Sequence, residues 1–250
     1  MENGGGFFKN TQIIILGVCI AVATIVSSFI LAQGSLKIMK FTREMITVTG
    51  SAQKIIRSDS IIWRCAFARS SADMTAAYQA LEKDLKKVLD YLAAKGIAKD
   101  DITVAQVSIT TVYKKNDKGN DTNEIYEYRL SQSVEVKSAD VERVTTVSRE
   151  STELINQDIG FESNAPEYYY TKLHELKVDM VAQATENAKQ RAQNMAKATG
   201  NRIGFMRSAR MGVFQITPAN SNDVTDYGMN DTSALDKKVT AVVTASFAIE

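Results

Sequence analysis

The side chains that could do chemistry in this chain are few, and they form no familiar catalytic or metal-binding motif. His174 is the only histidine among 250 residues. A helical zinc site of the His-Glu-x-x-His type needs a second histidine where this chain has Val178. A Gly-x-Ser-x-Gly nucleophile elbow is also absent. We therefore interpret His174 as structural or solvent-facing, and expect no catalytic residue and no enzyme activity.

Cys65 is the only cysteine after the apolar N-terminal run. It alternates with Ile61, Trp63 and Phe67, so in a strand all four side chains share one face. A buried thiol on such a face acts as a small hydrophobic group. A redox-sensing thiol would instead need an exposed, electropositive setting, and Arg64 points to the opposite face. We expect burial and keep redox sensing by Cys65 as the weaker alternative.

Acidic and amide side chains crowd the segment before the last predicted strand: Asp223, Asp226, Asn230, Asp231 and Asp236. Their spacing does not match the twelve-residue calcium loop, so we interpret the segment as a solvated loop. Phosphate-binding glycine motifs and a Cys-x-x-Cys pair are absent, so we expect no metal and no cofactor. With 30 basic and 29 acidic residues, the charge balance disfavours a nucleic-acid partner.

One aromatic run, Tyr168-Tyr169-Tyr170, is the remaining candidate site. It predicts either a strand with alternating faces or an exposed patch at a subunit contact. We expect Tyr169 to pack inside and leave Tyr168 and Tyr170 open. The same run is a candidate lining for a groove that binds a ligand or a peptide.

The N-terminal region carries an uncharged stretch between Lys9 and Lys37, apolar from Ile13 to Ala32. As a helix, these 20 residues span roughly 30 Å, the thickness of a hydrocarbon core. A cleaved signal peptide is the rival interpretation, but its apolar region is shorter and Ile30 would occupy a position that wants a small residue. We predict a tail at 1–11, a retained transmembrane anchor at 12–33, a juxtamembrane linker at 34–44 and one water-soluble domain at 45–250.

Periodicity in the soluble part predicts strands alternating with helices. The predicted strands cover residues 45–49 (ended by Gly50), 60–69, 102–113, about 126–136, 159–163, 202–217 and 237–249. Three helices are predicted: one capped at 71–73 and ended by Gly96, one from Ser138 or Asp140 to about Asn156, and one at 172–199 ended by Gly200. The last repeats Ala184, Ala188, Ala192 and Ala196 on one side. The order indicates an α+β fold of antiparallel sheet with about three helices.

Several segments over residues 45–250 together resemble the bacterial SIMPL-domain family. They are Ile46-Thr47-Val48-Thr49-Gly50, Gly96-Ile97 with Asp101-Ile102-Thr103, the alanine-rich run 184–200, and Gly212-Val213-Phe214-Gln215-Ile216-Thr217 with Asp226-Tyr227-Gly228 and Ala245-Ser246-Phe247. The last group resembles a membrane-anchored subgroup. The resemblance implies an α+β fold, an extracytoplasmic location and assembly into large rings or shells. It also links the relatives to the cell envelope and oxidative-stress defence, and offers no catalytic residues.

The charges that flank the apolar run and the family resemblance predict opposite sides of the membrane for the domain. Lys9 precedes the apolar run, whereas Lys37, Lys40 and Arg43 follow it, and basic residues favour the cytoplasmic side. The resemblance places the domain in the periplasm of a bacterial inner-membrane protein. We expect the domain to lie in the periplasm, because three basic residues after the apolar run are only a small charge bias towards the cytoplasm.

Our first hypothesis is a non-enzymatic, membrane-anchored envelope protein that self-associates into a large homo-oligomer. Exposed strands at 202–217 and 237–249 would supply edges for pairing between subunits. The second hypothesis is a periplasmic ligand- or peptide-binding module that uses Tyr168–Tyr170, with the ligand unidentified. A hydrolase or redox enzyme ranks last.

Overall fold

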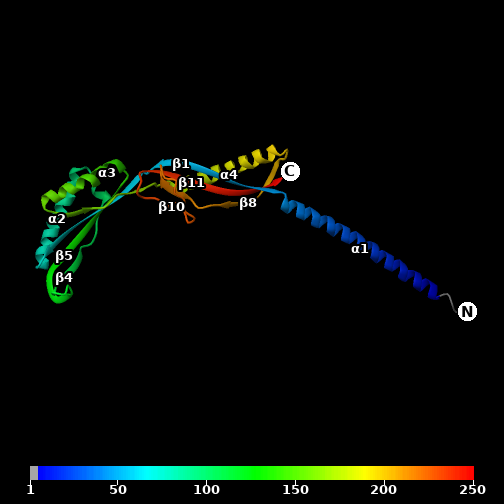
Figure 1. The fold of residues 1–250 in the computed structure, drawn as a ribbon, viewed down its shortest axis with the longest axis horizontal. Helices are drawn as coiled ribbons and strands as arrows, with labels where there is room; N and C mark the ends of the chain where they lie inside the picture. The colour runs from blue at the N-terminus through cyan, green and yellow to red at the C-terminus, as the bar shows by residue number, and fades with distance from the viewer. Residues whose placement is uncertain (1–4) are drawn as a thin grey trace. The chain divides into compact units, whose positions relative to one another are not determined.

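The computed structural model (Figure 1) describes the backbone of residues 5–250 and the side chains of residues 14–36 and 44–250. Helix α1 (Gly5–Arg43) contains a 23-residue stretch, Ile14–Leu36, that is long and apolar enough to cross a membrane. None of that stretch is buried against the rest of the chain. The helix continues through residues 34–43, the segment predicted as a linker. Residues 1–4 of the predicted tail lie outside the described residues, as do the side chains of the flanking basic residues Lys9, Lys37, Lys40 and Arg43.

The chain divides into two compact units. Unit 1 comprises Met1–Gly50, Thr185–Met211 and Val243–Glu250, and unit 2 comprises Ser51–Ala184 and Gly212–Val242. Strands β1 (Met45–Arg57) and β11 (Asp236–Ile249) and helix α4 (Leu173–Ala198) pass from one unit into the other. Helices and largely antiparallel sheets make the fold α+β, as predicted.

Unit 2 contains a six-stranded sheet that is buried on one face. Its strands run in the order β3-β5-β2-β6, with β4 also paired to β5 and β7 to β2. As the two-residue period predicts, Ile61, Trp63, Cys65 and Phe67 of β2 are all buried. Helices α2 and α3 pack on this face and share its core (Figure 1). The elements are β2 (Ser60–Ser71), α2 (Met74–Ala94), η1 (Lys99–Asp101), β3 (Ile102–Val104), β4 (Ser108–Lys115), β5 (Asp121–Ser138), α3 (Val141–Glu150), η2 (Ser151–Gln157), β6 (Gly160–Ser163) and β7 (Glu167–Tyr169).

Local capping signals fix the helix ends. Asp73 caps α2 by accepting a hydrogen bond from the Thr75 amide at 2.9 Å, and Asp140 caps α3 through the Arg143 amide at 3.1 Å. Gly96 and Gly200 follow the helices α2 and α4 with φ of +80° and +78°, a region that glycine enters without steric cost. These starts and stops confirm the predictions from the sequence.

The second sheet has the order β1-β11-β9-β10, with β8 also paired to β11. Its remaining strands are β8 (Ile203–Met211), β9 (Gln215–Pro218) and β10 (Met229–Asn230). In unit 1, Ala188 and Ala192 of α4 pack against Val48, Ala245 and Phe247. Small side chains here let the helix backbone lie close to the strands. The predicted alanine stripe is buried throughout, at 0–2% exposure.

Three predicted strand boundaries are wrong. Strand β1 continues past Gly50 to Arg57. The strand predicted at 102–113 is two strands, β3 and β4, with a break that begins at Ala105. The Ala105 amide still donates to the Ser133 carbonyl of β5. The Ala105 carbonyl, however, accepts from the side chain of Gln132. The strand predicted at 202–217 breaks at residues 212–214 into β8 and β9, which pair with successive parts of β11. Long-range pairing decided each of these boundaries.

We predict that Ala192→Leu lowers the free energy of unfolding by about 1–3 kcal/mol, because a larger side chain overpacks the fully buried contact with Val48 and Phe247. Urea unfolding of the full-length protein in detergent measures the change. Ala182→Leu, on an exposed face of the same helix, is the matched control and should change stability by less than about 0.5 kcal/mol. Equal effects of the two substitutions would contradict close packing of the stripe.

Candidate functional site

The Cys65 thiol is enclosed in the core of unit 2. Its side chain is fully buried, and Sγ lies 3.7 Å from the carbonyl oxygen of Val134, to which it donates. Burial raises the pKa of Cys65 to about 12, so the nucleophilic thiolate is scarcely populated near neutral pH. Arg64 lies on the other face, where its Nε donates to Glu135 at 2.7 Å. This setting is that of a packing residue and disfavours redox sensing.

The Tyr168–Tyr170 run pairs with β2 and divides between core and surface. Tyr168, rather than Tyr169, is the buried tyrosine, contrary to expectation. The reason is register: Tyr168 lies directly opposite Ile61, so both side chains point to the core face. The Tyr168 hydroxyl shares a 3.1 Å hydrogen bond with Thr145.

Tyr169 belongs to the partly exposed polar face instead. Its hydroxyl donates to Glu167 at 2.7 Å, and Glu167 also lies 3.3 Å from the Arg64 guanidinium. The hydrogen bond raises the pKa of Tyr169 and lowers the pKa of Glu167. The three tyrosines therefore do not form one continuous aromatic patch.

A cavity of about 50 Å³ lies beside the tyrosines, lined also by Ile56, Leu173, Ile216 and Lys237. Ligand pockets for drug-sized molecules enclose about 300–1,000 Å³, whereas this volume suits only one or two water molecules. The cavity beside Tyr168–Tyr170 is therefore smaller than the pockets that enclose drug-sized ligands.

Lys237 and Asp231 form a buried charge pair at this cavity. The side chains are 3% and 13% exposed, and Nζ lies 3.7 Å from a carboxylate oxygen of Asp231 while also donating to its backbone carbonyl. Burial lowers the pKa of Lys237, although Asp231 opposes the shift. Asp231 was predicted to lie in a solvated loop, so its pairing with a buried lysine corrects that expectation.

Asp231 also organises the turn that follows it. Its carboxylate accepts hydrogen bonds from the Ser233 hydroxyl at 2.7 Å, the Ser233 amide at 3.1 Å and the Ala234 amide at 3.0 Å. Although burial opposes the shift, these donors and Lys237 lower the pKa of Asp231. The pair connects the segment after β10 to β11 and is largely buried.

The other polar candidates from the sequence lie apart. His174 is exposed near the start of α4. Asp223 accepts a 2.7 Å hydrogen bond from Ser221 within its own loop. Within the described residues, no group of three histidine, cysteine or acidic side chains is placed to hold a metal ion.

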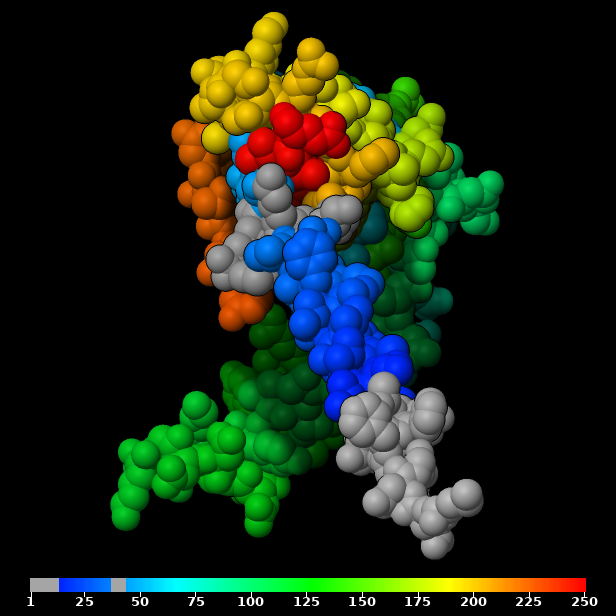
Figure 2. Space-filling view, turned by 90° about the vertical axis from the view of Figure 1, so that its right-hand side faces the viewer, coloured from blue at the N-terminus to red at the C-terminus, as the bar shows by residue number. Residues whose placement is uncertain are grey.

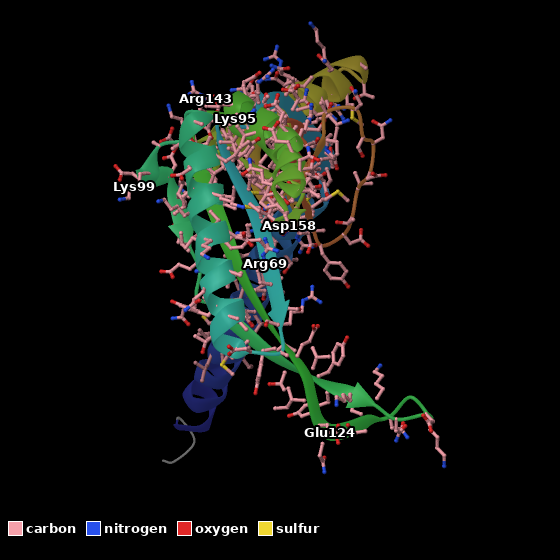
Figure 3. The ribbon with its side chains drawn as sticks, turned by 90° about the vertical axis from the view of Figure 1, so that its left-hand side faces the viewer. Arg69, Lys95, Lys99, Glu124, Arg143 and Asp158 are labelled. Atoms are coloured by element: carbon pink, nitrogen blue, oxygen red, sulfur yellow. The ribbon has the colours of Figure 1, made fainter. Side chains whose placement is uncertain are left out.

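Sequence reasoning missed a second ion pair, between Arg69 of β2 and Asp84 of α2. Arg69 donates to both carboxylate oxygens of Asp84, which is only 3% exposed, and reaches Asp158 Oδ2 at 3.2 Å (Figure 3). The signal was present in the sequence, because Asp84 falls on the buried stripe between Leu81 and Val88. This pair holds the helix, the strand and the turn before β6 together.

The β4–β5 hairpin of unit 2 exposes several large apolar side chains. It extends beyond the helix-covered sheet as a two-stranded ribbon, marked by Glu124 in Figure 3 and green in Figure 2. Four large apolar side chains on it are 43–61% exposed: Ile109, Tyr113, Ile125 and Tyr126. Within the described residues, β4 pairs only with β5, so its other edge is free. A free edge with exposed apolar side chains suits pairing with another chain.

Strand edges elsewhere differ from expectation. Strand β11 was predicted to offer an edge, but it lies inside its sheet, with β1 on one side and β8 and β9 on the other. Among the described strands, β8 pairs only with β11 and thus has a free edge. Of the two strands predicted to pair between subunits, only the β8 part remains available.

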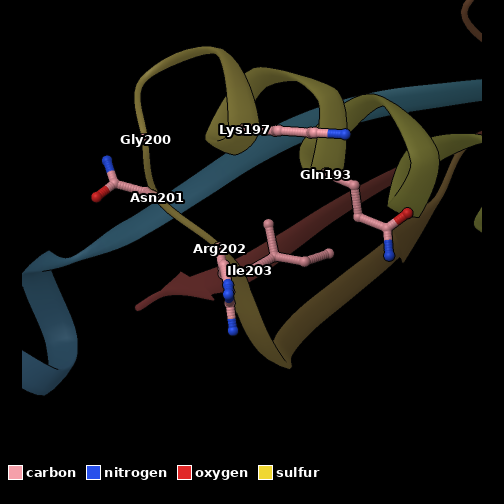
Figure 4. Close-up of a pocket in the computed structure, with 6 residues that line it drawn as sticks. All are labelled: Gln193, Lys197, Gly200, Asn201, Arg202 and Ile203. Carbon is pink, nitrogen blue, oxygen red and sulfur yellow. The ribbon is translucent and has the colours of Figure 1, made fainter.

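A groove of about 520 Å³ lies in unit 1 where α4 ends and β8 begins. Gln193 and Lys197 come from α4, Arg202 and Ile203 from the start of β8, and the turn at Gly200 and Asn201 lies between them (Figure 4). Neither Lys197 nor Arg202 has an ion pair within the described part of the chain. The groove is open, basic and amide-rich.

Comparison with known protein families identifies the family to which this domain is similar. A family model described as SIMPL, a protein of unknown function (DUF541), matches residues 46–247. The match begins in β1 and ends in β11, so it includes both sheets and leaves out α1. No curated protein matches the chain.

We predict that Asp231→Asn lowers the free energy of unfolding by about 3 kcal/mol, because it leaves the Lys237 ammonium buried without its counter-charge. Lys237→Met should cost less, about 1 kcal/mol, because Asp231 keeps its hydrogen bonds from Ser233 and Ala234. Urea unfolding at neutral pH measures both, with the exposed Asp226→Asn as the control.

The pH dependence follows from the sign of the Asp231 shift. Because the folded pKa is lowered from 3.8, the contribution of the carboxylate is present above that value and is lost as pH falls through the folded pKa. The stability difference between the native protein and Asp231→Asn should therefore shrink in acid. A difference that grows on acidification would contradict the assigned pair.

Proposed function

Because the chain belongs to the SIMPL family and carries an N-terminal helix able to span a bilayer, we propose that it is a non-enzymatic cell-envelope protein that self-associates. In this proposal α1 is a retained single-pass anchor, and the SIMPL domain forms a large homo-oligomer. The observation that carries the assembly is the β4–β5 hairpin, which exposes apolar side chains along a free strand edge.

Anchoring rests on the length and exposure of the apolar stretch in α1. The 23 residues Ile14–Leu36 make about 35 Å of helix, enough for a hydrocarbon core of about 30 Å. Their side chains remain exposed in the folded chain, so lipid is the solvent that suits them. We place the domain in the periplasm of a bacterial inner-membrane protein, on the strength of its resemblance to extracytoplasmic SIMPL proteins.

The physical properties of the hairpin support self-association. A two-stranded ribbon without a packed face is marginal in water, so covering it stabilises both the ribbon and the contact. Tyr113 and Ile125 lie directly opposite one another, and both are 43% exposed. Anchors confined to one plane raise the local concentration of the domains, so weak contacts suffice.

A non-enzymatic role fits the arrangement of the polar groups. Among the residues that the structure describes, the two most buried ion pairs, Lys237–Asp231 and Arg69–Asp84, each connect elements of the fold. Any contribution to oxidative-stress defence would not act through Cys65, whose pKa burial raises to about 12.

We predict that Ile109→Glu/Tyr126→Glu weakens self-association by at least roughly 30-fold in dissociation constant, as expected when about 2 kcal/mol of interface contact is lost. Light scattering of the full-length protein in detergent, over a dilution series, measures the mass. Val224→Glu/Tyr227→Glu is the matched control, because these side chains are 76% and 96% exposed and lie outside the hairpin.

A wild-type protein that remains monomeric at micromolar concentration would overturn self-association. A control variant that dissociates as readily as the hairpin variant would instead remove the hairpin from the contact. The two results are distinguishable in one experiment.

Location is tested separately by fusing, after Glu250, a reporter enzyme that is active only outside the cytoplasm. We expect the fusion to be active in a bacterial host and to sediment with membranes. A matched fusion that joins the same reporter directly after Glu2, before the apolar run, should be inactive. A well-expressed but inactive fusion at Glu250 would place the domain in the cytoplasm.

A further inference from the structure

Charge is distributed unequally between the two units, although the whole chain is nearly neutral. Counted from the sequence, unit 2 has 20 basic and 25 acidic residues, whereas unit 1 has 10 basic and 4 acidic. From Lys37 onward, the basic residues of unit 1 are Lys37, Lys40, Arg43, Lys189, Arg191, Lys197, Arg202, Arg207 and Arg210, against Glu44, Glu186 and Glu250. The positive charge is therefore concentrated in the unit that contains α1.

Backbone hydrogen bonds connect the basic groove to the end of α1. Arg202 and Glu250 exchange two 2.8 Å backbone bonds, and the neighbouring Ile249 amide donates to the Glu44 carbonyl at 3.1 Å. Figure 2 shows the C-terminal residues in red beside the yellow residues near 200. Two strand spacings separate Arg202 from Glu44, or roughly 10 Å. Glu44 immediately follows the last residue of α1.

The distance from the bilayer is short as well. Glu44 lies eight positions after Leu36, the end of the apolar stretch, and eight helical steps span about 12 Å. The headgroup layer is about 5–8 Å thick on each side, and charges act over a Debye length of about 8–10 Å. Long arginine and lysine side chains on this part of unit 1 therefore come within reach of lipid phosphates.

The groove itself suits an anionic group. Its volume of about 520 Å³ is large enough for a lipid headgroup, and it presents Lys197, Arg202 and the amides of Gln193 and Asn201. Two of the last carbonyls of α4 already have backbone partners, because Ala196 accepts from the Asn201 amide and Lys197 from the Gly200 amide. The two basic side chains therefore have to outweigh the partial negative charge of the helix C-terminus. Three residues after Arg202, Phe205 is 82% exposed, an apolar side chain suited to the membrane interface.

From these observations we propose that the Lys197–Arg202 face of unit 1 docks onto the surface of the bilayer that α1 crosses, by binding the phosphates of anionic lipids. The proposal rests on the anchoring part of the proposed function. It requires neither the hairpin contact nor a particular side of the membrane.

Removing two basic side chains should weaken docking by a measurable amount. Each basic residue at an anionic surface contributes about fivefold to binding, so Lys197→Gln/Arg202→Gln should weaken docking by roughly 25-fold. Both side chains are exposed, so the substitutions leave the alanine-packed core untouched.

The test uses the full-length protein inserted into nanodiscs of phosphatidylcholine alone, or of phosphatidylcholine mixed with phosphatidylglycerol. Hydrogen–deuterium exchange of residues 199–206 is compared between the two lipids. We expect slower exchange in the anionic discs, and loss of that protection in Lys197→Gln/Arg202→Gln and at high salt. Lys115→Gln/Lys118→Gln, on the hairpin, removes the same charge and should keep the protection. Unchanged exchange in β2 verifies that each variant is folded.

Equal exchange in the two lipids overturns the docking proposal while leaving the anchor intact. Protection that inorganic phosphate reproduces in phosphatidylcholine discs also overturns it, because the groove would then be a small-anion site rather than a membrane contact. Failure of the full-length chain to insert into either disc overturns both the anchor and the docking.

Discussion

Among the described residues, the apolar stretch Ile14–Leu36 of α1 packs against nothing else in the chain, and the proposed function depends on that exposure. Twenty-three residues from Ile14 to Leu36 are exposed, and a helix that is apolar on all sides is not stable in water. In the proposed anchoring, a bilayer is the solvent that covers this helix. The anchor would then hold the domain close to a surface, where its basic residues could contact lipid and its free strand edges could contact neighbouring copies.

The interior and the surface of the domain differ in what they do. Inside, polar groups serve the architecture: Arg69 holds Asp84 of α2 against β2, and Lys237 holds Asp231 beside β11. Such pairs are costly to break, yet they offer no open space to a substrate. Outside, the hairpin carries exposed apolar side chains and unit 1 carries an excess of positive charge. The proposed self-association and membrane docking depend on these two surfaces.

The sequence predicted what local signals determine and missed what distant pairing determines. The alternation through Trp63 and Cys65, the caps at Asp73 and Asp140 and the stop at Gly200 were each readable from a few neighbouring residues. The interior place of β11, the break at Ala105 and the burial of Tyr168 were not, because each depends on a strand far away in the sequence. Asp231 is an example. Its polar neighbours in the sequence predicted a solvated loop, and a lysine at position 237 is equally compatible with an exposed strand end. The sequence therefore did not indicate that the two side chains form a buried pair.

The inert thiol of Cys65 has a consequence for how this protein is made. Cys19 lies inside the apolar stretch and Cys65 is buried in the core, so the domain that follows α1 exposes no thiol for cross-linking. The described domain therefore has its fold without a disulfide, and that fold suits a reducing and an oxidising compartment alike. In the proposed periplasmic location, export would not have to be coupled to oxidative folding.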